Sequence, residues 1–121
     1  MIVSGGCHCE LVRFEASITD GPVELLDCDC SICRMTGYLH LIVPETKFRL
    51  VEGKGETTTY RFGSGKARHI FCKQCGIKSF YKPRSHPDAI SVNWRCVDEE
   101  GRPADVTIVP FDGRNHPGAV G

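Results

Sequence analysis

The sequence has no excess of charge of either sign and no long apolar run. Fifteen lysines and arginines balance fifteen aspartates and glutamates in 121 residues, so no global field favours nucleic acid or an anionic membrane as a partner. No apolar run approaches the length of about 18 residues that a membrane-spanning helix needs. The N-terminus, MIVSGGCHCE, lacks the charged segment and apolar stretch of a secretory signal. We therefore expect a cytoplasmic protein that binds a small molecule or one specific partner.

The sequence also lacks a convincing amphipathic helix, a low-complexity tract and an internal repeat. Residues 10–18, ELVRFEASI, alternate apolar and polar side chains with the period of a half-buried strand. Further segments rich in β-branched and aromatic residues predict strands within residues 22–27, 38–44, 47–53, 57–62, 67–72, 77–82, 89–93 and 105–111. One short helix is expected over residues 31–36, ended by Gly37. The prediction is a mostly β single domain of antiparallel sheets over residues 1–111, followed by a loosely held tail over residues 112–121.

Cysteine is far more abundant than in ordinary intracellular proteins, with eight in the chain. Seven fall in three close sets, Cys7-x-Cys9, Cys28-x-Cys30-x-x-Cys33 and Cys72-x-x-Cys75, and only Cys96 stands alone. Neighbours at these spacings can converge on one tetrahedral ion, whereas a structural disulfide usually joins distant segments. Without a secretory signal the disulfide interpretation weakens further. The spacing therefore favours metal binding.

Two of the sets complete a four-thiolate site. On a strand, Cys7 and Cys9 would present their sulfurs on one face, with His8 pointing away. Cys72 ends a predicted strand, and Cys75 with Gly76 completes a tight turn of the zinc-knuckle kind. We expect these four cysteines to hold a structural zinc that fastens a small core.

The remaining set, Cys28, Cys30 and Cys33, offers three sulfurs from one turn. Three protein ligands with a vacant position is the arrangement of a catalytic zinc. Soft thiolate ligands suit an ion that binds and activates a substrate thiolate. Two alternatives remain open: Cys96 could be a fourth ligand and close the site, or the cysteines could be a redox dithiol. Cys96 is otherwise interpreted as a buried free thiol.

Several stretches of the sequence together resemble one known family, from about Gly5 to about Phe111. They are GGCHCELVRFEA, CDCSICR, LIVPETKFRLVEG, TTTYRF and FCKQCGIKSFYKPRSHPDAISVN. The chain is identified from them as similar to the glutathione-dependent formaldehyde-activating enzymes, in the branch that contains centromere protein V. The family usually has glycine after the first C-x-C pair, where this chain has Glu10.

The resemblance implies an Mss4-like, β-rich fold organised around two zinc ions. It assigns Cys7, Cys9, Cys72 and Cys75 to a structural zinc, and Cys28, Cys30 and Cys33 to a second, catalytic zinc. The implied activity is carbon-sulfur lyase chemistry, the interconversion of S-hydroxymethylglutathione with glutathione and formaldehyde.

Arg84, two histidines and the single tryptophan could have functional or ordinary structural roles. Arg84, in the PRS segment after the last cysteine pair, could bind a carboxylate of a glutathione-like ligand through two hydrogen bonds, or belong to a surface turn. His40 and His69 could flank a pocket, although ordinary hydrogen-bonded strand histidines fit their positions better. The single tryptophan, Trp94, is expected to pack in the core.

The leading hypothesis is a two-zinc enzyme acting on an adduct of glutathione, or another small thiol, with formaldehyde or a related aldehyde. A second hypothesis is a non-catalytic module in which both zinc ions are structural and the β surface binds a protein or nucleic acid. For nucleic acid, the module would need a local basic face around Lys66, Arg68, Lys73, Lys78, Lys82 and Arg84. A third hypothesis is a sensor of thiols or metals.

Overall fold

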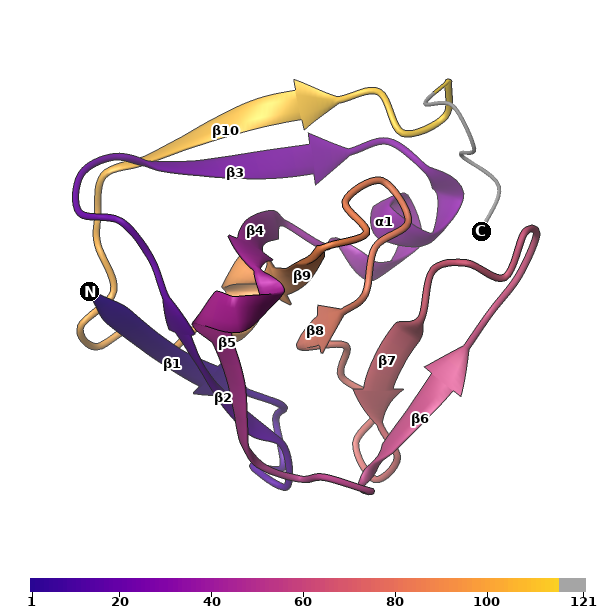
Figure 1. The fold of residues 1–121 in the computed structure, drawn as a ribbon, viewed down its shortest axis with the longest axis horizontal. Helices are drawn as coiled ribbons and strands as arrows, with labels where there is room; N and C mark the ends of the chain where they lie inside the picture. Colours follow the sequence, from indigo (N-terminus) through magenta and orange to yellow (C-terminus); the bar gives the residue numbers. More distant parts are fainter. Residues whose placement is uncertain (116–121) are drawn as a thin grey trace.

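The computed structural model describes residues 1–115, and strands in three sheets dominate this part of the chain (Figure 1). The first sheet pairs β1 (Ile2–Gly6), β2 (Arg13–Ser17) and β5 (Phe48–Glu52), in that order. The second has the order β10-β3-β4-β9-β8 and comprises β3 (Val23–Cys28), β4 (His40–Pro44), β8 (Phe80–Tyr81), β9 (Ala89–Asn93) and β10 (Val106–Phe111). The third pairs β6 (Thr57–Tyr60) with β7 (His69–Cys72).

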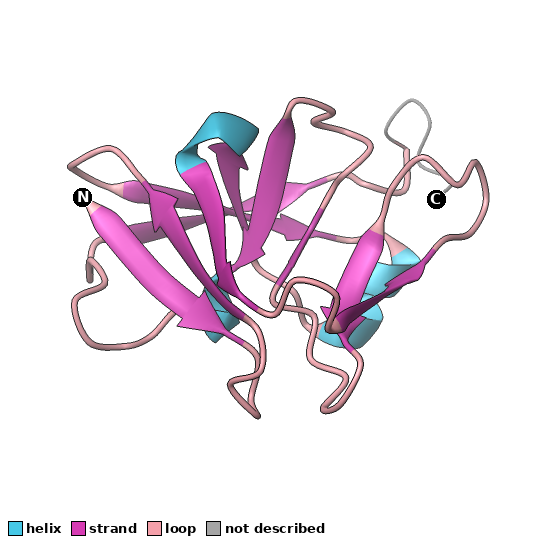
Figure 2. Cartoon of the chain, turned by 60° about the horizontal axis from the view of Figure 1, so that its bottom comes forward, coloured by secondary structure: helices cyan, strands magenta, loops and turns pink. Residues whose placement is uncertain are grey.

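Within residues 1–115, helical structure is confined to short pieces (Figure 2). The α-helix α1 spans Ser31–Thr36, and Gly37 ends it in the left-handed conformation with φ of 65°. A residue without Cβ adopts that conformation at no steric cost. The predicted helix and its end are therefore confirmed. Two 3-10 turns occur at Glu45–Lys47 and Trp94–Cys96.

The mostly β fold class is confirmed, with one difference in strand direction. The pairs within the first sheet and the pair β6–β7 are antiparallel, as expected. Strands β3 and β10, however, pair in parallel, with Val23 opposite Val106 and Cys28 opposite Phe111. A parallel pair needs a long connection, and here nearly the whole middle of the chain, from Asp29 to Asp105, provides it.

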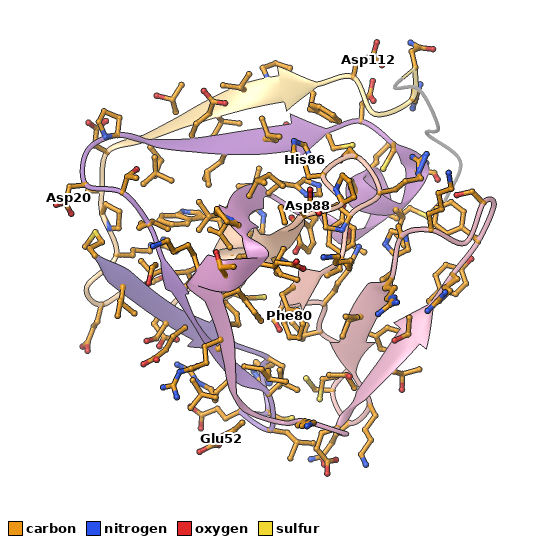
Figure 3. All side chains as sticks on the ribbon, in the orientation of Figure 1. Asp20, Glu52, Phe80, His86, Asp88 and Asp112 are labelled. Atoms are coloured by element: carbon orange, nitrogen blue, oxygen red, sulfur yellow. The ribbon has the colours of Figure 1, made fainter. Side chains whose placement is uncertain are left out.

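The core forms where the sheets face one another, around a group of three phenylalanines. The ring of Phe14 lies 5.6 Å from that of Phe48 and 6.4 Å from that of Phe80. Figure 3 places Phe80 in the interior, while Asp20 and Glu52 lie at the periphery. The alternation predicted for residues 10–18 is present in β2, where Phe14 and Ala16 are buried. Each fully buried Phe contributes about 1.5–3 kcal/mol of hydrophobic stabilisation.

The end of the described chain lies against the turn after β3. The backbone N–H of Arg114 donates to a carboxylate oxygen of Asp29 at 3.0 Å, and its Nε donates to the carbonyl of Asp29 at 3.2 Å. The rest of the predicted tail, residues 116–121, lies outside the described part. Among the described residues, no helix has the length and apolar character to cross a membrane.

Candidate metal centres

The first cysteine cluster brings together Cys7, Cys9, Cys72 and Cys75, whose sulfurs all lie within 4.8 Å of one another. The sulfur of Cys9 is 3.7 Å from that of Cys7 and 3.7 Å from that of Cys72. A tetrahedral zinc with bonds of about 2.3 Å has sulfur–sulfur edges of about 3.8 Å, whereas a disulfide bond measures about 2.05 Å. All eight cysteines are free thiols. The spacing fits an ion and not a crosslink.

Two tight turns provide the four sulfurs, and one of them differs from the prediction. Cys7 and Cys9 lie in the turn between β1 and β2, not on a strand as expected, because β1 ends at Gly6. Glu10 then adopts φ of 67°, the conformation that glycine usually supplies. The residue that departs from the family pattern thus keeps a glycine-like turn.

The second turn follows β7, where Gly76 has φ of 78° and its N–H donates to the carbonyl of Cys72 at 2.9 Å. The backbone N–H groups of Gln74 and Cys75 both donate to the sulfur of Cys72 at 3.4 Å. Hydrogen bonds of this kind stabilise a thiolate and so lower the pKa of Cys72. The turn is therefore suited to holding a metal-binding thiolate, as the zinc-knuckle interpretation predicts.

The second cluster contains His40, a residue expected from the sequence to be an ordinary hydrogen-bonded strand histidine. The donor atoms that all lie within 4.8 Å of one another here are those of Cys28, Cys33 and His40. Cys28 ends β3, Cys33 lies in α1 and His40 begins β4. The thiol of Cys30 contacts those of Cys28 and Cys33, and these hydrogen bonds lower the pKa of Cys30. Cys28 and Cys33 therefore meet with His40, while Cys30 lies outside this set and contacts both thiols.

His40 is held as a neutral imidazole that can offer a lone pair. Its Nε2 lies 3.1 Å from the sulfur of Cys33, and its Nδ1 lies 2.7 Å from the hydroxyl oxygen of Ser91. Burial is the main cause that lowers the pKa of His40 to about 4, followed by the charge of Lys78. A metal-binding histidine commonly has its other ring nitrogen fixed in this way. The sequence signal is that His40 follows the helix-ending Gly37 and opens the next strand, seven residues after Cys33.

Cys96, the alternative fourth ligand, belongs to neither cluster of the described residues. Its sulfur lies 4.0 Å from the carbonyl oxygen of Lys78. Burial raises the pKa of the Cys96 thiol to about 11, so it remains protonated. His40, and not Cys96, is thus the residue positioned to complete a fourth protein ligand at the second cluster.

A small cavity of about 50 Å³ adjoins the second cluster. Its wall includes Cys28, Cys30, His69, Tyr81 and Arg84. The Nε and Nη1 atoms of Arg84 are buried there and have no hydrogen-bond partner among the described residues. A buried cationic donor left without an acceptor costs free energy. Arg84 thus lines the same cavity as Cys28 and Cys30, and the site combines thiols with unmatched donors suited to an anion.

Trp94 and His86 make ordinary packing and hydrogen-bond contacts. Trp94 is 6% exposed and belongs to the core, which confirms its predicted role. His86 lies below β3 (Figure 3), with its Nδ1 at 2.8 Å from the hydroxyl oxygen of Ser85.

The basic face considered for nucleic acid loses three of its six cations to burial or ion pairs. Lys78 is only 8% exposed, Lys73 pairs with Glu56 at 2.7 Å, and Lys82 pairs with Glu45. One of the six cations is therefore buried and two are paired with carboxylates, which reduces the positive charge that this part of the described chain could offer a phosphate backbone.

A family model, a curated relative and a solved structure all agree with the family resemblance of the sequence. The model of the family described as glutathione-dependent formaldehyde-activating enzyme matches residues 2–109. A Halomonas elongata protein named "Putative glutathione-dependent formaldehyde-activating enzyme" is 33% identical over 107 residues, which cover 77% of this chain and 67% of that protein. A crystal structure of a Rhodobacter sphaeroides protein is similar with a TM-score of 0.74 and 33% identity, covering 88% of this chain and 99% of that one.

Proposed function

The chain belongs to the glutathione-dependent formaldehyde-activating enzyme family, and from that premise we propose that it forms and cleaves the carbon-sulfur bond between a small thiol and formaldehyde. The thiol is glutathione or a related carboxylate-bearing thiol. The observation that carries the proposal is the cavity in which the thiols of Cys28 and Cys30 lie beside the buried, unmatched donors of Arg84.

Two zinc ions are proposed as cofactors, with different roles. Cys7, Cys9, Cys72 and Cys75 would hold a structural ion, which the sulfur spacing of 3.7 Å supports. Cys28, Cys30 and Cys33 would hold the second, with His40 as a further donor. Zinc at the second site would supply a soft Lewis acid that keeps a bound thiol in its thiolate form at neutral pH.

The ligand count at the second site affects how a substrate reaches it. Cys28, Cys33 and His40 place three donor atoms within 4.8 Å of one another, and Cys30 contacts both thiols. A fourth position is therefore not open merely because there are three cysteines. Cys28, Cys30, Cys33 and His40 would hold the zinc, and the ion would supply the Lewis acidity that binds the substrate sulfur. The hydrogen bond between Nδ1 of His40 and the hydroxyl of Ser91 fixes the orientation of the imidazole.

Arg84 would select the thiol by its carboxylate. A guanidinium presents paired N–H donors that match the two oxygens of a carboxylate, and Arg84 has two such nitrogens buried without acceptors in the described part of the chain. A carboxylate would satisfy both donors and remove the cost of leaving them unpaired. The tripeptide body of glutathione would extend outside the cavity.

The cavity itself suits the one-carbon partner. A volume of about 50 Å³ is comparable to one or two water molecules, whose share of liquid volume is about 30 Å³ each. In the forming direction the thiolate sulfur donates an electron pair to the carbonyl carbon of formaldehyde, and the resulting alkoxide takes up a proton. Cleavage is the reverse: the hydroxyl loses its proton, the C–S bond breaks, and the electron pair returns to sulfur.

The proposal is tested by metal content and by exchange kinetics on the same variants. We expect about two zinc ions per wild-type chain, about one in Cys33→Ser, and an unchanged content in Cys96→Ser, the matched control outside both clusters. Exchange NMR of glutathione with formaldehyde should show an accelerated rate with the wild type and Cys96→Ser, and the spontaneous rate with Cys33→Ser. A Cys33→Ser variant as active as the wild type would refute the role of the second site.

The Arg84 assignment has a separate readout in the choice of thiol. Arg84→Met should raise KM for glutathione by about 10- to 100-fold, the worth of hydrogen bonds to a charged group. The same variant should leave KM for 2-mercaptoethanol, which has no carboxylate, unchanged. An equal rise for both thiols would show that Arg84 acts on the fold and not on the carboxylate.

A further inference from the structure

A histidine in the cavity wall is fixed in orientation by rings on two sides. The ring of His69 stacks on Tyr81 at 5.1 Å, with 17° between the planes, and on Phe62 at 5.2 Å, with 21°. All three residues line the cavity that adjoins Cys28 and Cys30. The imidazole therefore cannot flip out of its plane without breaking both stacks.

A buried lysine decides which nitrogen of that ring can act. The Nζ of Lys78 lies 2.9 Å from Nδ1 of His69. The same ammonium lies 3.7 Å from the centre of the Tyr81 ring and 4.9 Å from that of Tyr38. Because Nδ1 contacts Lys78, proton exchange with a group in the cavity would use the other ring nitrogen, Nε2.

We propose that His69 is the proton-transfer residue of this site and that Lys78 is the positioning residue that sets its tautomer and exchanges a proton with it. The proposal rests on the thiol–formaldehyde chemistry proposed above and supplies the group that moves the proton. His69 would touch the reacting oxygen, whereas Lys78 acts only through His69.

The pair has two states that match the two directions of the reaction. With Lys78 as an ammonium donating to Nδ1, the neutral ring carries its proton on Nε2 and presents a donor to the cavity. When the thiolate attacks formaldehyde, the alkoxide takes the Nε2 proton while Nδ1 takes one from Lys78, which becomes a neutral amine. In cleavage the hydroxyl proton moves to Nε2, Nδ1 returns its proton to Lys78, and the electron pair of the broken C–S bond goes to sulfur. No oxidant or further reactant is needed.

The surroundings of Lys78 favour this exchange near neutral pH. Burial is the largest influence and lowers the pKa of Lys78 to about 8, while the thiolates of Cys33 and its neighbours act in the opposite direction. A general acid works best when its pKa is near the working pH. Among the described residues, the titratable and charged groups around the pair are Tyr38, Tyr81, Cys28, Cys30, Cys33, His40 and Arg84.

The tautomer is tested directly, without turnover, on zinc-loaded protein labelled with ¹⁵N-histidine. Long-range ¹H–¹⁵N spectra, with His69 assigned by its absence in His69→Gln, should show the Nε2–H form at pH 7. They should show the Nδ1–H form above pH 9, when Lys78 is neutral and accepts. Lys78→Met should abolish this pH-dependent conversion, and Lys82→Met, a surface control four residues along, should retain it. A wild-type His69 tautomer that is the same at both pH values, or a conversion that persists in Lys78→Met, would overturn the pairing.

Catalysis is tested by exchange NMR of glutathione with formaldehyde across pH 6–10. His69→Gln should lower kcat by about 10²- to 10⁴-fold, the usual worth of a general acid-base group, with KM for glutathione and zinc content unchanged. Lys78→Met should lower kcat and remove the limb of the pH profile that the wild type shows near pH 8. Wild-type protein without any acceleration would overturn the proposed function and this role with it, whereas acceleration that survives His69→Gln would overturn the role of His69 alone.

Discussion

At the scale of single residues, Lys78 stands out because a lysine is almost never fully buried without a partner. Its ammonium has lost most of its water, and contacts with the rings of Tyr81 and Tyr38 and with Nδ1 of His69 replace it only in part. Burying the charged ammonium lowers the stability of the folded protein, and deprotonation removes this penalty. The stability of the protein should therefore depend on pH.

Lys78 should make the protein more stable as pH rises from about 8 to 10.5. Burial lowers its pKa in the folded protein to about 8 from an ordinary value of 10.5, so within this window the unfolded chain binds a proton that the folded chain does not. The free energy of unfolding of Lys78→Met should exceed that of the wild type at pH 8. This difference should fall by about 3 kcal/mol between pH 8 and pH 10.5, at about 1.36 kcal/mol per pH unit. Chemical denaturation at fixed pH values measures it, with Lys82→Met as a control that shows no trend. If the difference in unfolding free energy between Lys78→Met and the wild type does not change with pH, then Lys78 keeps its ordinary pKa.

At the scale of elements, the sequence was most informative where local chemistry decides the outcome. The helix Ser31–Thr36 and its end at Gly37 follow from the left-handed conformation that Gly37 adopts. The strand over residues 10–18 follows from side chains that alternate between core and solvent, with Phe14 and Ala16 inward. These features need no information from distant parts of the chain.

Three features could not be predicted from the sequence because they depend on distant contacts or on backbone angles. The parallel pairing of β3 with β10 joins segments from opposite ends of the chain, which no local pattern encodes. Cys7 and Cys9 come together by a turn and not by strand alternation, since Glu10 adopts a glycine-like conformation. His40 could not be identified as a donor because the seven clustered cysteines already supply the ligands expected for two sites. Its approach to Cys33 depends on how β4 follows α1.

The segment after β10 offers an element-scale test of how the second cluster is enclosed. A Cβ added to Gly113 would overlap the sulfur of Cys28 and come within 3.2 Å of the Cβ of Cys30, and Gly113 lies outside the left-handed region, so only the contact opposes substitution. Gly113→Ala should weaken zinc at the second site on the order of tenfold or more, as displacement of supporting groups does. Competition with a chromogenic chelator measures this. The first site is the internal control, and Asn115→Ala should behave as wild type. Unchanged affinity in Gly113→Ala would mean that the segment moves away freely.

At the scale of the whole molecule, the two clusters join different parts of the fold. The first connects the turn between β1 and β2 to the turn after β7, and so ties the first sheet to the third, whose strands lie apart in Figure 1. The second joins β3, α1 and β4, and β3 and β4 are already paired in one sheet. Losing the first cluster therefore removes a link between sheets, whereas losing the second removes a link within one.

This difference predicts unequal stability costs for two cysteine substitutions. Structural zinc in small domains contributes about 10–16 kcal/mol of apparent binding free energy, as much as the total stability of about 5–15 kcal/mol of an ordinary domain. Cys72→Ser should thus prevent cooperative folding, while Cys33→Ser should still melt cooperatively, because the phenylalanine core and the first cluster remain. Circular dichroism melting of zinc-loaded protein, with Cys96→Ser as control, measures both. A Cys72→Ser variant that melts like the wild type would show that β6 and β7 are held by side-chain packing alone, and the first ion would then have no structural role.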